Sequence, residues 1–214
     1  MTTAIIGTGN IGRTVASQLV AGGETVVLAA TTTPNQLAKE LGDLATATSV
    51  PEAIDSADVI VFAVWLDVMK GLLEQYGARL ANKVVVDPSN PVAANEKGEI
   101  GRTLPEGVSS GSVVAGLLPD TAHYVKAFGT LSAPTLENAA NRTPDRAVLF
   151  YATDDIEAQA VIERLISISG FDPVKAGGVD AATRIEFGGD LSEYGLNGQL
   201  VNVQEAWAAI ASGR

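Results

Sequence analysis

A glycine-rich turn that joins the first strand-like segment to the first helix-like segment constrains the fold of this chain more than any other feature. Residues 4–6 are a short apolar run, and the next six residues read Gly-Thr-Gly-Asn-Ile-Gly, from Gly7 to Gly12. Apolar residues then recur at helical spacing until Gly22 and Gly23 end the pattern. Because a G-x-G-x-x-G turn here follows a strand and opens a helix, it predicts the first β–α unit of a Rossmann-type fold.

Each glycine of the turn has its own mechanical role. Gly7 permits the tight turn from strand to helix, Gly9 lets a pyrophosphate approach the backbone, and Gly12 lets helix and strand pack closely. The helix N-terminus offers free N–H groups and a partial positive charge to phosphates. The alternative is a glycine-rich turn without a ligand. We expect a nicotinamide dinucleotide site that includes Gly7, Thr8, Gly9, Asn10, Ile11 and Gly12.

Strand-like and helix-like segments alternate along the rest of the chain. Strands are predicted at residues 25–28, 59–64, 83–87, 123–128, 146–152 and from Val174 onward. Helices are predicted from Pro34, with Thr33 as the capping residue, and at residues 67–80, 156–168 and 191–210, whereas residues 88–108 resemble a loop. This order predicts an α/β, Rossmann-type doubly wound, mostly parallel sheet with a short C-terminal helical cap. We expect the NAD(P)-binding Rossmann domain to span residues 1–178 and the cap residues 179–214.

The end of the second strand bears on the choice between NADP and NAD. NAD sites usually carry an acidic residue about 20 residues after the glycines, to bind the ribose 2′-hydroxyl. Here residues 29–33 read Ala-Ala-Thr-Thr-Thr, without a carboxylate. Three hydroxyls are available to a 2′-phosphate, and Arg13 adds a positive charge just after the third glycine. The segment favours NADP over NAD, with a threonine-rich capping loop as the alternative.

Two further candidate segments follow predicted strands at their carboxyl ends, where ligands bind in open α/β sheets. Ala63, Val64 and Trp65 follow the most apolar strand, and we expect them to meet the ribose or pyrophosphate. For Trp65, packing against neighbouring side chains is an equal alternative to a cofactor contact. Asn90 and Pro91 follow the next strand, beside Ser89, and are candidates to orient the nicotinamide, with an Asx turn as the alternative.

Composition excludes several classes of protein. The chain has no cysteine and one histidine, which excludes disulfides, thiolate sites, a cysteine nucleophile and a histidine-rich metal site. Its formal net charge of −11 disfavours nucleic acid and anionic membranes as partners. No apolar run is long enough to span a bilayer, and the N-terminus lacks a basic signal-peptide region, so that we expect a cytoplasmic protein.

Four stretches of the sequence, taken together, resemble one family. They are residues 4–12, 84–91 (Val-Val-Val-Asp-Pro-Ser-Asn-Pro), 125–130 (Val-Lys-Ala-Phe-Gly-Thr) and 176–186. Together they are similar to the NADPH-dependent deazaflavin (coenzyme F-420) reductases and the predicted dinucleotide-binding oxidoreductases related to them. The resemblance covers essentially the whole chain. The glycine turn is shared with many dehydrogenases, whereas the three later stretches are more specific in combination.

The resemblance implies hydride transfer between NADP(H) and a deazaflavin co-substrate. It also implies NADP contacts from Thr8 and, by position, from Ala30 and Thr31. This sequence departs from the family at those two positions, where relatives often carry a Ser-Arg pair. It departs again at Gly129, where relatives commonly have Asn or His beside the nicotinamide. The first departure bears on 2′-phosphate affinity and the second on the identity of the acceptor.

Other ionisable residues have a structural and a functional interpretation. His123 is either a general acid–base group or a loop-edge histidine. Lys126 lies in an apolar strand, so that it is either an edge residue with its amine in water or an anion contact. Arg184 and Glu186 are interpreted as a structural pair. Hydride transfer depends mainly on alignment of the two reactants, so a site with few acid–base groups remains compatible with it.

The sequence thus predicts an NAD(P)-dependent oxidoreductase that transfers hydride to a deazaflavin-like or other small acceptor. A non-catalytic, redox-sensing dinucleotide-binding module is one alternative. A relative of imine or 3-hydroxy acid reductases is another, although those enzymes need a long helical second domain. A stripe at helical spacing in the tail predicts a homodimer or, equally, packing on the chain's own Rossmann body. Its members are Leu200, Val203, Trp207 and Ile210.

Overall fold

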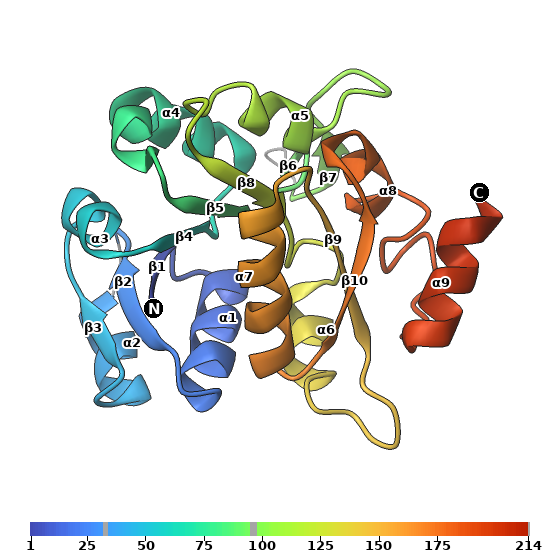
Figure 1. The fold of residues 1–214 in the computed structure, drawn as a ribbon, viewed down its shortest axis with the longest axis horizontal. Coiled ribbons are helices and arrows are strands. Elements are labelled where there is room, and N and C mark those ends of the chain that lie inside the picture. The colour runs from blue at the N-terminus through green and yellow to red at the C-terminus, as the bar shows by residue number, and fades with distance from the viewer. Residues whose placement is uncertain (32–33, 95–97, 214) are drawn as a thin grey trace.

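The computed structural model describes residues 1–31, 34–94 and 98–213. Within these residues eight strands form one sheet, in the order β10-β9-β8-β5-β4-β1-β2-β3 (Figure 1). The strands are β1 (Thr2–Ile6), β2 (Thr25–Ala29), β3 (Ala45–Ala47), β4 (Val59–Phe62), β5 (Val84–Asp87), β8 (His123–Lys126), β9 (Val148–Ala152) and β10 (Asp172–Gly177). A separate hairpin pairs β6 (Val92–Ala94) with β7 (Ile100–Arg102).

Helices connect the strands and cover both faces of the sheet. They are α1 (Asn10–Ala21), α2 (Pro34–Leu41), α3 (Val50–Ser56), α4 (Leu66–Tyr76), α5 (Ser110–Ala115), α6 (Ala133–Asn138), α7 (Ile156–Ile168), α8 (Ala182–Ile185) and α9 (Val203–Ser212). Short 3-10 turns follow α4 (Gly77–Leu80) and precede α8 (Val179–Ala181).

The sheet is mostly parallel, as predicted. All neighbouring strands from β3 to β8 run parallel, β9 runs antiparallel to β8, and β10 runs parallel to β9. The Rossmann-type α/β fold is therefore confirmed. The parallel arrangement brings the carboxyl ends of β1, β4, β5 and β8 to one edge of the sheet.

Alternate residues of the strands serve two hydrophobic layers. On β1, Ile5 packs into the layer made with α1, α2, α6 and α7, whereas Ala4 and Ile6 pack into the layer made with α3, α4 and α5. A third cluster joins Phe150 of β9 and Val174 of β10 to Ile185 of α8 and Ala206 of α9. The C-terminal helices thus cover the end of the sheet beside β10 (Figure 1).

The first turn of the chain is packed as the glycine pattern predicts. Gly7 has a φ of 99°, and a Cβ on it would lie 2.4 Å from the Ala63 carbonyl oxygen. A Cβ on Gly12 would lie 2.0 Å from the Gly7 carbonyl oxygen. Helix α1 therefore rests directly on the turn, and the turn rests on the residue that follows β4.

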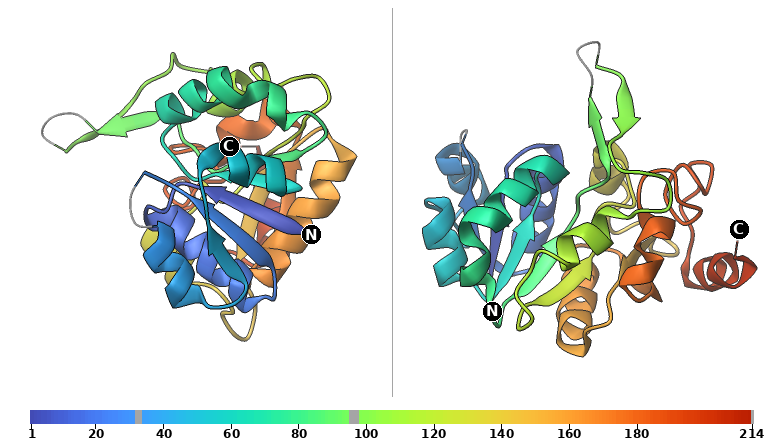
Figure 2. Two further views of the ribbon diagram at one scale, coloured as in Figure 1. Left: turned by 90° about the vertical axis from the view of Figure 1, so that its left-hand side faces the viewer. Right: turned by 90° about the horizontal axis from the view of Figure 1, so that it is seen from above.

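Several boundaries differ from the prediction. The strand predicted at residues 59–64 ends at Phe62, and the helix predicted at 67–80 begins at Leu66 and tightens to a 3-10 turn after Tyr76. The short elements β3, α3, α5 and α6 were not predicted. Residues 88–108 are not only a loop, because they contain the β6–β7 hairpin, which projects from the body (Figure 2). The predicted cap at Thr33, with Thr32, lies outside the described residues.

The prediction of a helix over residues 191–210 is wrong for its first half. Residues 191–202 form turns, and α9 begins at Val203 behind a capping box of Asn202 and Glu205. Left-handed backbone at Asn197 (φ 54°) and Gly198 (φ 75°) is incompatible with a helix there.

The stripe predicted in the tail divides between two environments. Leu200 packs against the main core and Ile210 against the third cluster, whereas 39% of Val203 and 52% of Trp207 are exposed. Half of the stripe thus packs on the chain itself.

The homodimer stays a prediction. Light scattering of the intact chain and of a Trp207→Glu variant would test it, because a dimer formed through this face would dissociate in the variant.

We predict that Gly12→Ala lowers the free energy of unfolding by about 1–3 kcal/mol, because the added Cβ overlaps the Gly7 carbonyl. Gly71→Ala is the matched control, since Gly71 is exposed in α4 with no atom within 4 Å of its added Cβ. Alanine should stabilise that helix by about 0.5–1 kcal/mol. Chemical denaturation of both variants measures the effect, and a Gly12→Ala protein as stable as the parent would contradict this packing.

Candidate cofactor and substrate site

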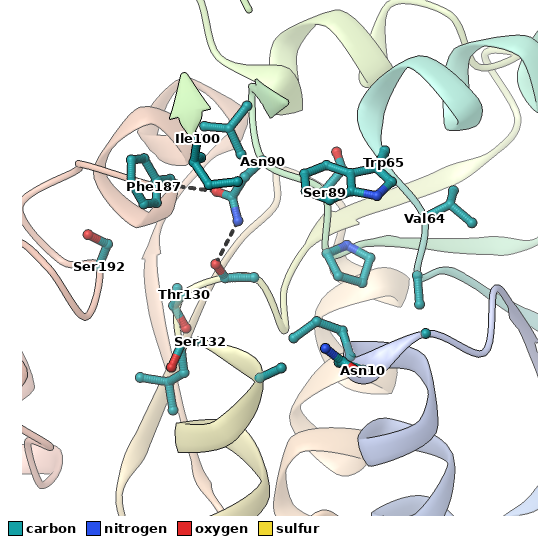
Figure 3. A pocket seen from close by; sticks show the side chains of 18 of the residues that line it. Asn10, Val64, Trp65, Ser89, Asn90, Ile100, Thr130, Ser132, Phe187 and Ser192 are labelled. Carbon is teal, nitrogen blue, oxygen red and sulfur yellow. Dashed lines mark hydrogen bonds between the residues drawn. The ribbon is translucent and has the colours of Figure 1, made fainter. Parts of the chain in front are cut away.

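A pocket of about 650 Å³ opens at the sheet edge where β1, β4, β5 and β8 end (Figure 3). Four short segments that follow these strands form its floor and walls. The hairpin and the segment after α8 complete it. The lining residues are Gly9, Asn10, Ile11, Ala63, Val64, Trp65, Pro88, Ser89, Asn90, Val92, Ile100, Gly129, Thr130, Leu131, Ser132, Ala133, Phe187, Ser192 and Tyr194.

Half of the site residues predicted from the sequence line this pocket. They are Gly9, Asn10, Ile11, Ala63, Val64, Trp65 and Asn90. Gly7 and Gly12 shape the turn from behind, and Thr8 lies between the turn glycines without lining the pocket. Pro91 is buried beside the pocket, where its carbonyl accepts a hydrogen bond from the Thr103 amide.

The residues predicted for 2′-phosphate selection lie apart from the pocket lining. Ala30 is half-buried and Thr31 is exposed, directly after β2. Arg13 lines a neighbouring groove between α1, α2 and α6 and forms an ion pair of 2.9 Å with Glu40. The guanidinium of Arg13 is therefore already partnered in this structure.

The N-terminus of α1 faces the pocket without a side-chain cap among the described residues. Gly9 is the N-cap residue, with a φ of −71°, and an added Cβ there would meet no atom within 4 Å. The first N–H groups of a helix have no intrahelical partners. The space that a side chain would fill at Gly9 thus adjoins the end of a helix with free donors, which is the arrangement that suits a phosphate.

Asn90 ties three pocket segments together. Its Nδ2 donates to the Gly129 carbonyl at 3.0 Å, and its Oδ1 accepts from the Phe187 amide at 2.6 Å (Figure 3). The side chain is largely committed to holding the pocket walls. A Cβ on Gly129 would lie 2.4 Å from the Pro88 carbonyl oxygen, so a larger side chain does not fit this backbone.

Sequence reasoning missed the residues of the hairpin and of the C-terminal segment. Val92 and Ile100 form one side of the pocket, and Phe187 and Tyr194 form another, with their rings in edge-to-face contact at 4.9 Å. Trp65, Ile100, Phe187 and Tyr194 are all at least 40% exposed. Two aromatic residues after Arg184, Phe187 and Tyr194, were the available signal, but a helix was predicted over residues 191–210, which include Tyr194.

A buried ionic cluster lies beneath the floor of the pocket. The Lys126 amine lies 2.9 Å from Asp87 Oδ2 and 2.7 Å from Ser110 Oγ, and it also donates to the Ser89 carbonyl. Asp87 in turn accepts from the Ser89 amide at 2.7 Å. Both ionic side chains are 3% exposed or less. Of the two interpretations of Lys126, the edge residue with its amine in water is wrong, because the amine is buried against the carboxylate of Asp87.

Glu186 belongs to the same cluster and not to a pair with Arg184. Its carboxylate accepts from the Ser110 amide (3.1 Å), the Ser110 hydroxyl (2.8 Å) and the Gly111 amide (2.9 Å), and it lies 3.6 Å from the Lys126 amine. Arg184 instead forms a bidentate ion pair with Asp190. Burial, together with Asp87 and Glu186, holds the pKa of Tyr124 well above its ordinary value, so its hydroxyl stays a donor to Asp87.

His123 lies away from the pocket, at the amino end of β8. Its Nδ1 is 2.8 Å from Asp155 Oδ2, and its Nε2 is 3.2 Å from Glu157 Oε2. Asp155 is also the N-cap of α7. The position supports the structural interpretation of His123.

In the described part of the chain, no cluster of His, Cys, Asp and Glu side chains has the form of a metal site. No helix among the same residues is long and apolar enough to cross a membrane.

A family model matches the N-terminal part of the chain. Residues 2–91 match the family model described as "NADP oxidoreductase coenzyme F420-dependent". This match covers the first 91 residues of the 214-residue chain, apart from Met1. They contain the glycine turn and the pocket segments that follow β1, β4 and β5. The family resemblance predicted from the sequence is confirmed.

A curated relative is the metalloreductase STEAP3 of Rattus norvegicus, which is 31% identical over 182 residues. The match covers 85% of this chain and 35% of the rat protein. The chain thus spans about a third of the length of that relative.

Solved structures extend the similarity to nearly the whole chain. The hypothetical protein SMa0349 of Sinorhizobium meliloti has a TM-score of 0.81 at 29% identity, over 94% of this chain and 95% of that one. A candidate F420-dependent NADP-reductase from Arthrobacter sp. FB24 has a TM-score of 0.72 at 23% identity, over 85% and 87%. A reductive aminase of Aspergillus terreus in complex with NADPH shares the fold at a TM-score of 0.59 and 20% identity, over 85% of this chain and 56% of the aminase.

We predict that Lys126→Met lowers the free energy of unfolding by about 3–5 kcal/mol, because it leaves Asp87 and Glu186 buried without their cation. Adding Glu186→Gln should recover part of this loss. Lys70→Met is the control, since that amine is well exposed and its 3.5 Å contact with Asp67 is a surface pair. Urea unfolding measures all three, and a Lys126→Met protein no less stable than Lys70→Met would show that the cluster is not ionised.

Proposed function

We propose that this chain is an NADP(H)-dependent oxidoreductase that transfers hydride to a small ring acceptor of the deazaflavin type. The observation that carries the proposal is the pocket itself, which runs from an uncapped helix N-terminus in a family-typical glycine turn to an apolar, aromatic-rimmed space at the ends of β5 and β8. The family match over residues 2–91 supports the class of reaction. When bound, NADPH supplies a hydride, and the acceptor takes a further proton from water.

The residues present fit a dinucleotide along the first half of the pocket. The amides that begin α1 would hold the pyrophosphate, in the space left open at Gly9. Ala63, Val64 and Trp65 would contact the ribose and the nicotinamide ring. Asn90 would act by fixing the walls around the nicotinamide, because its amide links Gly129 to Phe187.

The acceptor would occupy the second half. Trp65, Ile100, Phe187 and Tyr194 offer a broad apolar rim that suits the face of a planar ring. Hydride transfer requires closeness and alignment of two rings more than it requires an acid–base side chain. The uncharged lining of this part of the pocket is compatible with that requirement.

Two alternatives give different outcomes in the same assay. A non-catalytic redox-sensing module would bind NADPH but would not oxidise it, whichever acceptor is added. An imine reductase would oxidise NADPH with cyclic imines. The reductase and aminase structures of this type share the fold, but the chain spans only 56–62% of their length. Turnover of NADPH against deazaflavin, flavin, quinone and imine acceptors separates the three.

We predict that Gly9→Val weakens NADPH binding tenfold or more, because the side chain would occupy the space at the helix N-terminus and remove a charge-assisted hydrogen bond worth roughly 1.5–3 kcal/mol. The protein should remain folded, since nothing lies within 4 Å of the added Cβ and the backbone there is unstrained. Gly71→Val provides the control for the substitution itself. Isothermal titration with NADPH, alongside thermal unfolding, measures the effect; a folded Gly9→Val protein with parental affinity would refute the site.

We predict that NADPH binds more tightly than NADH, because residues 29–33 place no carboxylate after β2. Quenching of tryptophan fluorescence reports binding, since Trp65 lines the pocket. Ala30→Asp adds the missing carboxylate and should shift the preference toward NADH, whereas Ala30→Asn should not. Equal affinities of the parent for both cofactors would contradict the prediction.

A further inference from the structure

The lining of the pocket is uncharged, but a buried group of ionic side chains lies directly beneath its floor. Among the described residues that line the pocket, none is an Asp, Glu, Lys, Arg or His. Asp87 and Glu186 each immediately precede a residue of the lining. The Lys126 amine donates to the carbonyl of Ser89, which is itself a lining residue (Figure 3). The buried charges are therefore joined to the floor through its own backbone.

This buried cluster contains two carboxylates and one amine. The Lys126 amine lies 2.9 Å from Asp87 and 3.6 Å from Glu186, and all three side chains are 3% exposed or less. Tyr124 donates to Asp87 and stays neutral, because burial, together with Asp87, holds its pKa well above the ordinary value. With the amine protonated and both carboxylates ionised, the cluster carries one net negative charge.

The hydrogen bonds of the two carboxylates favour their ionised form. Among the described residues, Glu186 accepts from the amides of Ser110 and Gly111, at 3.1 and 2.9 Å, and from the Ser110 hydroxyl at 2.8 Å. Asp87 accepts from the Ser89 amide at 2.7 Å and from two side-chain donors. Donors that point at a carboxylate stabilise its charge. The second carboxylate is thus held as an anion by N–H and O–H groups and not by a second cation.

Structural pairing accounts for one carboxylate of the cluster and not for the other. One amine beside one carboxylate would already connect β5 to β8 without a net charge. Burial of a further charge is costly even where hydrogen bonds surround it. Arg184 does not balance this charge, because it is paired with Asp190, and Arg102 is exposed on the hairpin, where solvent screens it. The floor therefore presents a net negative charge to the pocket.

A negative charge at this place has a defined effect on hydride transfer. In the proposed function, the walls that Asn90 holds together enclose the nicotinamide. Transfer of a hydride to the acceptor removes two electrons and one proton from the dihydronicotinamide, so that its ring changes from neutral to singly positive. A fixed negative charge in a buried floor stabilises the positive ring more than the neutral one.

We propose that the buried cluster of Asp87, Lys126 and Glu186 sets the redox balance of the bound cofactor. Its net negative charge favours NADP⁺ over NADPH and thereby makes bound NADPH a stronger hydride donor. The inference rests on the proposed function and adds to it a role for side chains that do not line the pocket. It concerns the nicotinamide alone and holds for any acceptor.

NADP⁺ and NADPH test the inference directly, because they share both riboses and every phosphate and differ in the charge of the nicotinamide ring. Isothermal titration of the parent with each form, at the same low ionic strength, gives the two dissociation constants. We expect NADP⁺ to bind about fivefold or more tightly than NADPH. A tenfold ratio would lower the midpoint potential of the bound couple by about 30 mV, since the couple transfers two electrons.

Three variants assign the preference to the charge of the cluster. Glu186→Gln removes the excess charge with little change of shape, and it should lower the preference for NADP⁺ several-fold. Ser110→Ala is the matched structural control, because it removes the hydroxyl that joins Lys126 to Glu186 and leaves the net charge unchanged. Glu74→Gln controls for the loss of an exposed charge. Both controls should keep the parental ratio of dissociation constants.

The outcomes separate this inference from the proposed function. Should Glu186→Gln fail to fold, Asp87→Asn removes the same amount of charge, and the ratio in the parent needs no variant. The inference is overturned if the parent binds NADPH as tightly as NADP⁺, if a folded Glu186→Gln or Asp87→Asn protein keeps the parental ratio, or if Ser110→Ala lowers the ratio equally. If neither form of the cofactor binds the parent, the proposed function itself fails.

Discussion

The backbone of the first turn lies so close to its neighbours that no side chain fits between them, and the site depends on that contact. Gly7 lies against the carbonyl of Ala63, and Gly12 lies against the carbonyl of Gly7. One chain segment therefore fixes both the N-terminus of α1 and the residues that follow β4. Because neither Gly7 nor Gly12 has room for a Cβ, backbone atoms set the distance between the N-terminus of α1 and the residues that follow β4. These two walls of the pocket are therefore held in a fixed position relative to each other.

The other half of the pocket is held by polar contacts between residues far apart in the sequence. Lys126 reaches Asp87 and Ser89, Glu186 reaches Ser110 and Gly111, and Asn90 reaches Gly129 and Phe187. Buried ionic groups of this kind contribute little net stability when complete, but removing one partner is costly. Their effect is to fix one arrangement of four loops around the ends of β5 and β8.

The sequence was most informative where structure depends on local pattern. The glycine turn, the parallel strands and α7 follow from periodicity and glycine placement within a dozen residues, and the fold class follows from their order. The β6–β7 hairpin was missed because its strands are three residues each and gain their stability from the body beside them. The partners of Lys126 and Glu186 were missed because they are 16 to 76 residues away, a separation that no local pattern encodes. Seven of the predicted pocket residues were found because strand ends of a parallel sheet meet at one edge.

The side of the pocket away from the glycine turn is formed mainly by two segments that are not part of the β–α units, the hairpin and residues 187–194. Neither segment contributes a strand to the eight-stranded sheet. Changes in their length or side chains thus leave the sheet and the glycine turn intact, in keeping with the general tolerance of surface loops for variation. A fold of this kind can acquire a new partner molecule by exchanging two surface segments while its dinucleotide machinery stays fixed, which makes these segments the natural place to begin redesigning the specificity of the protein.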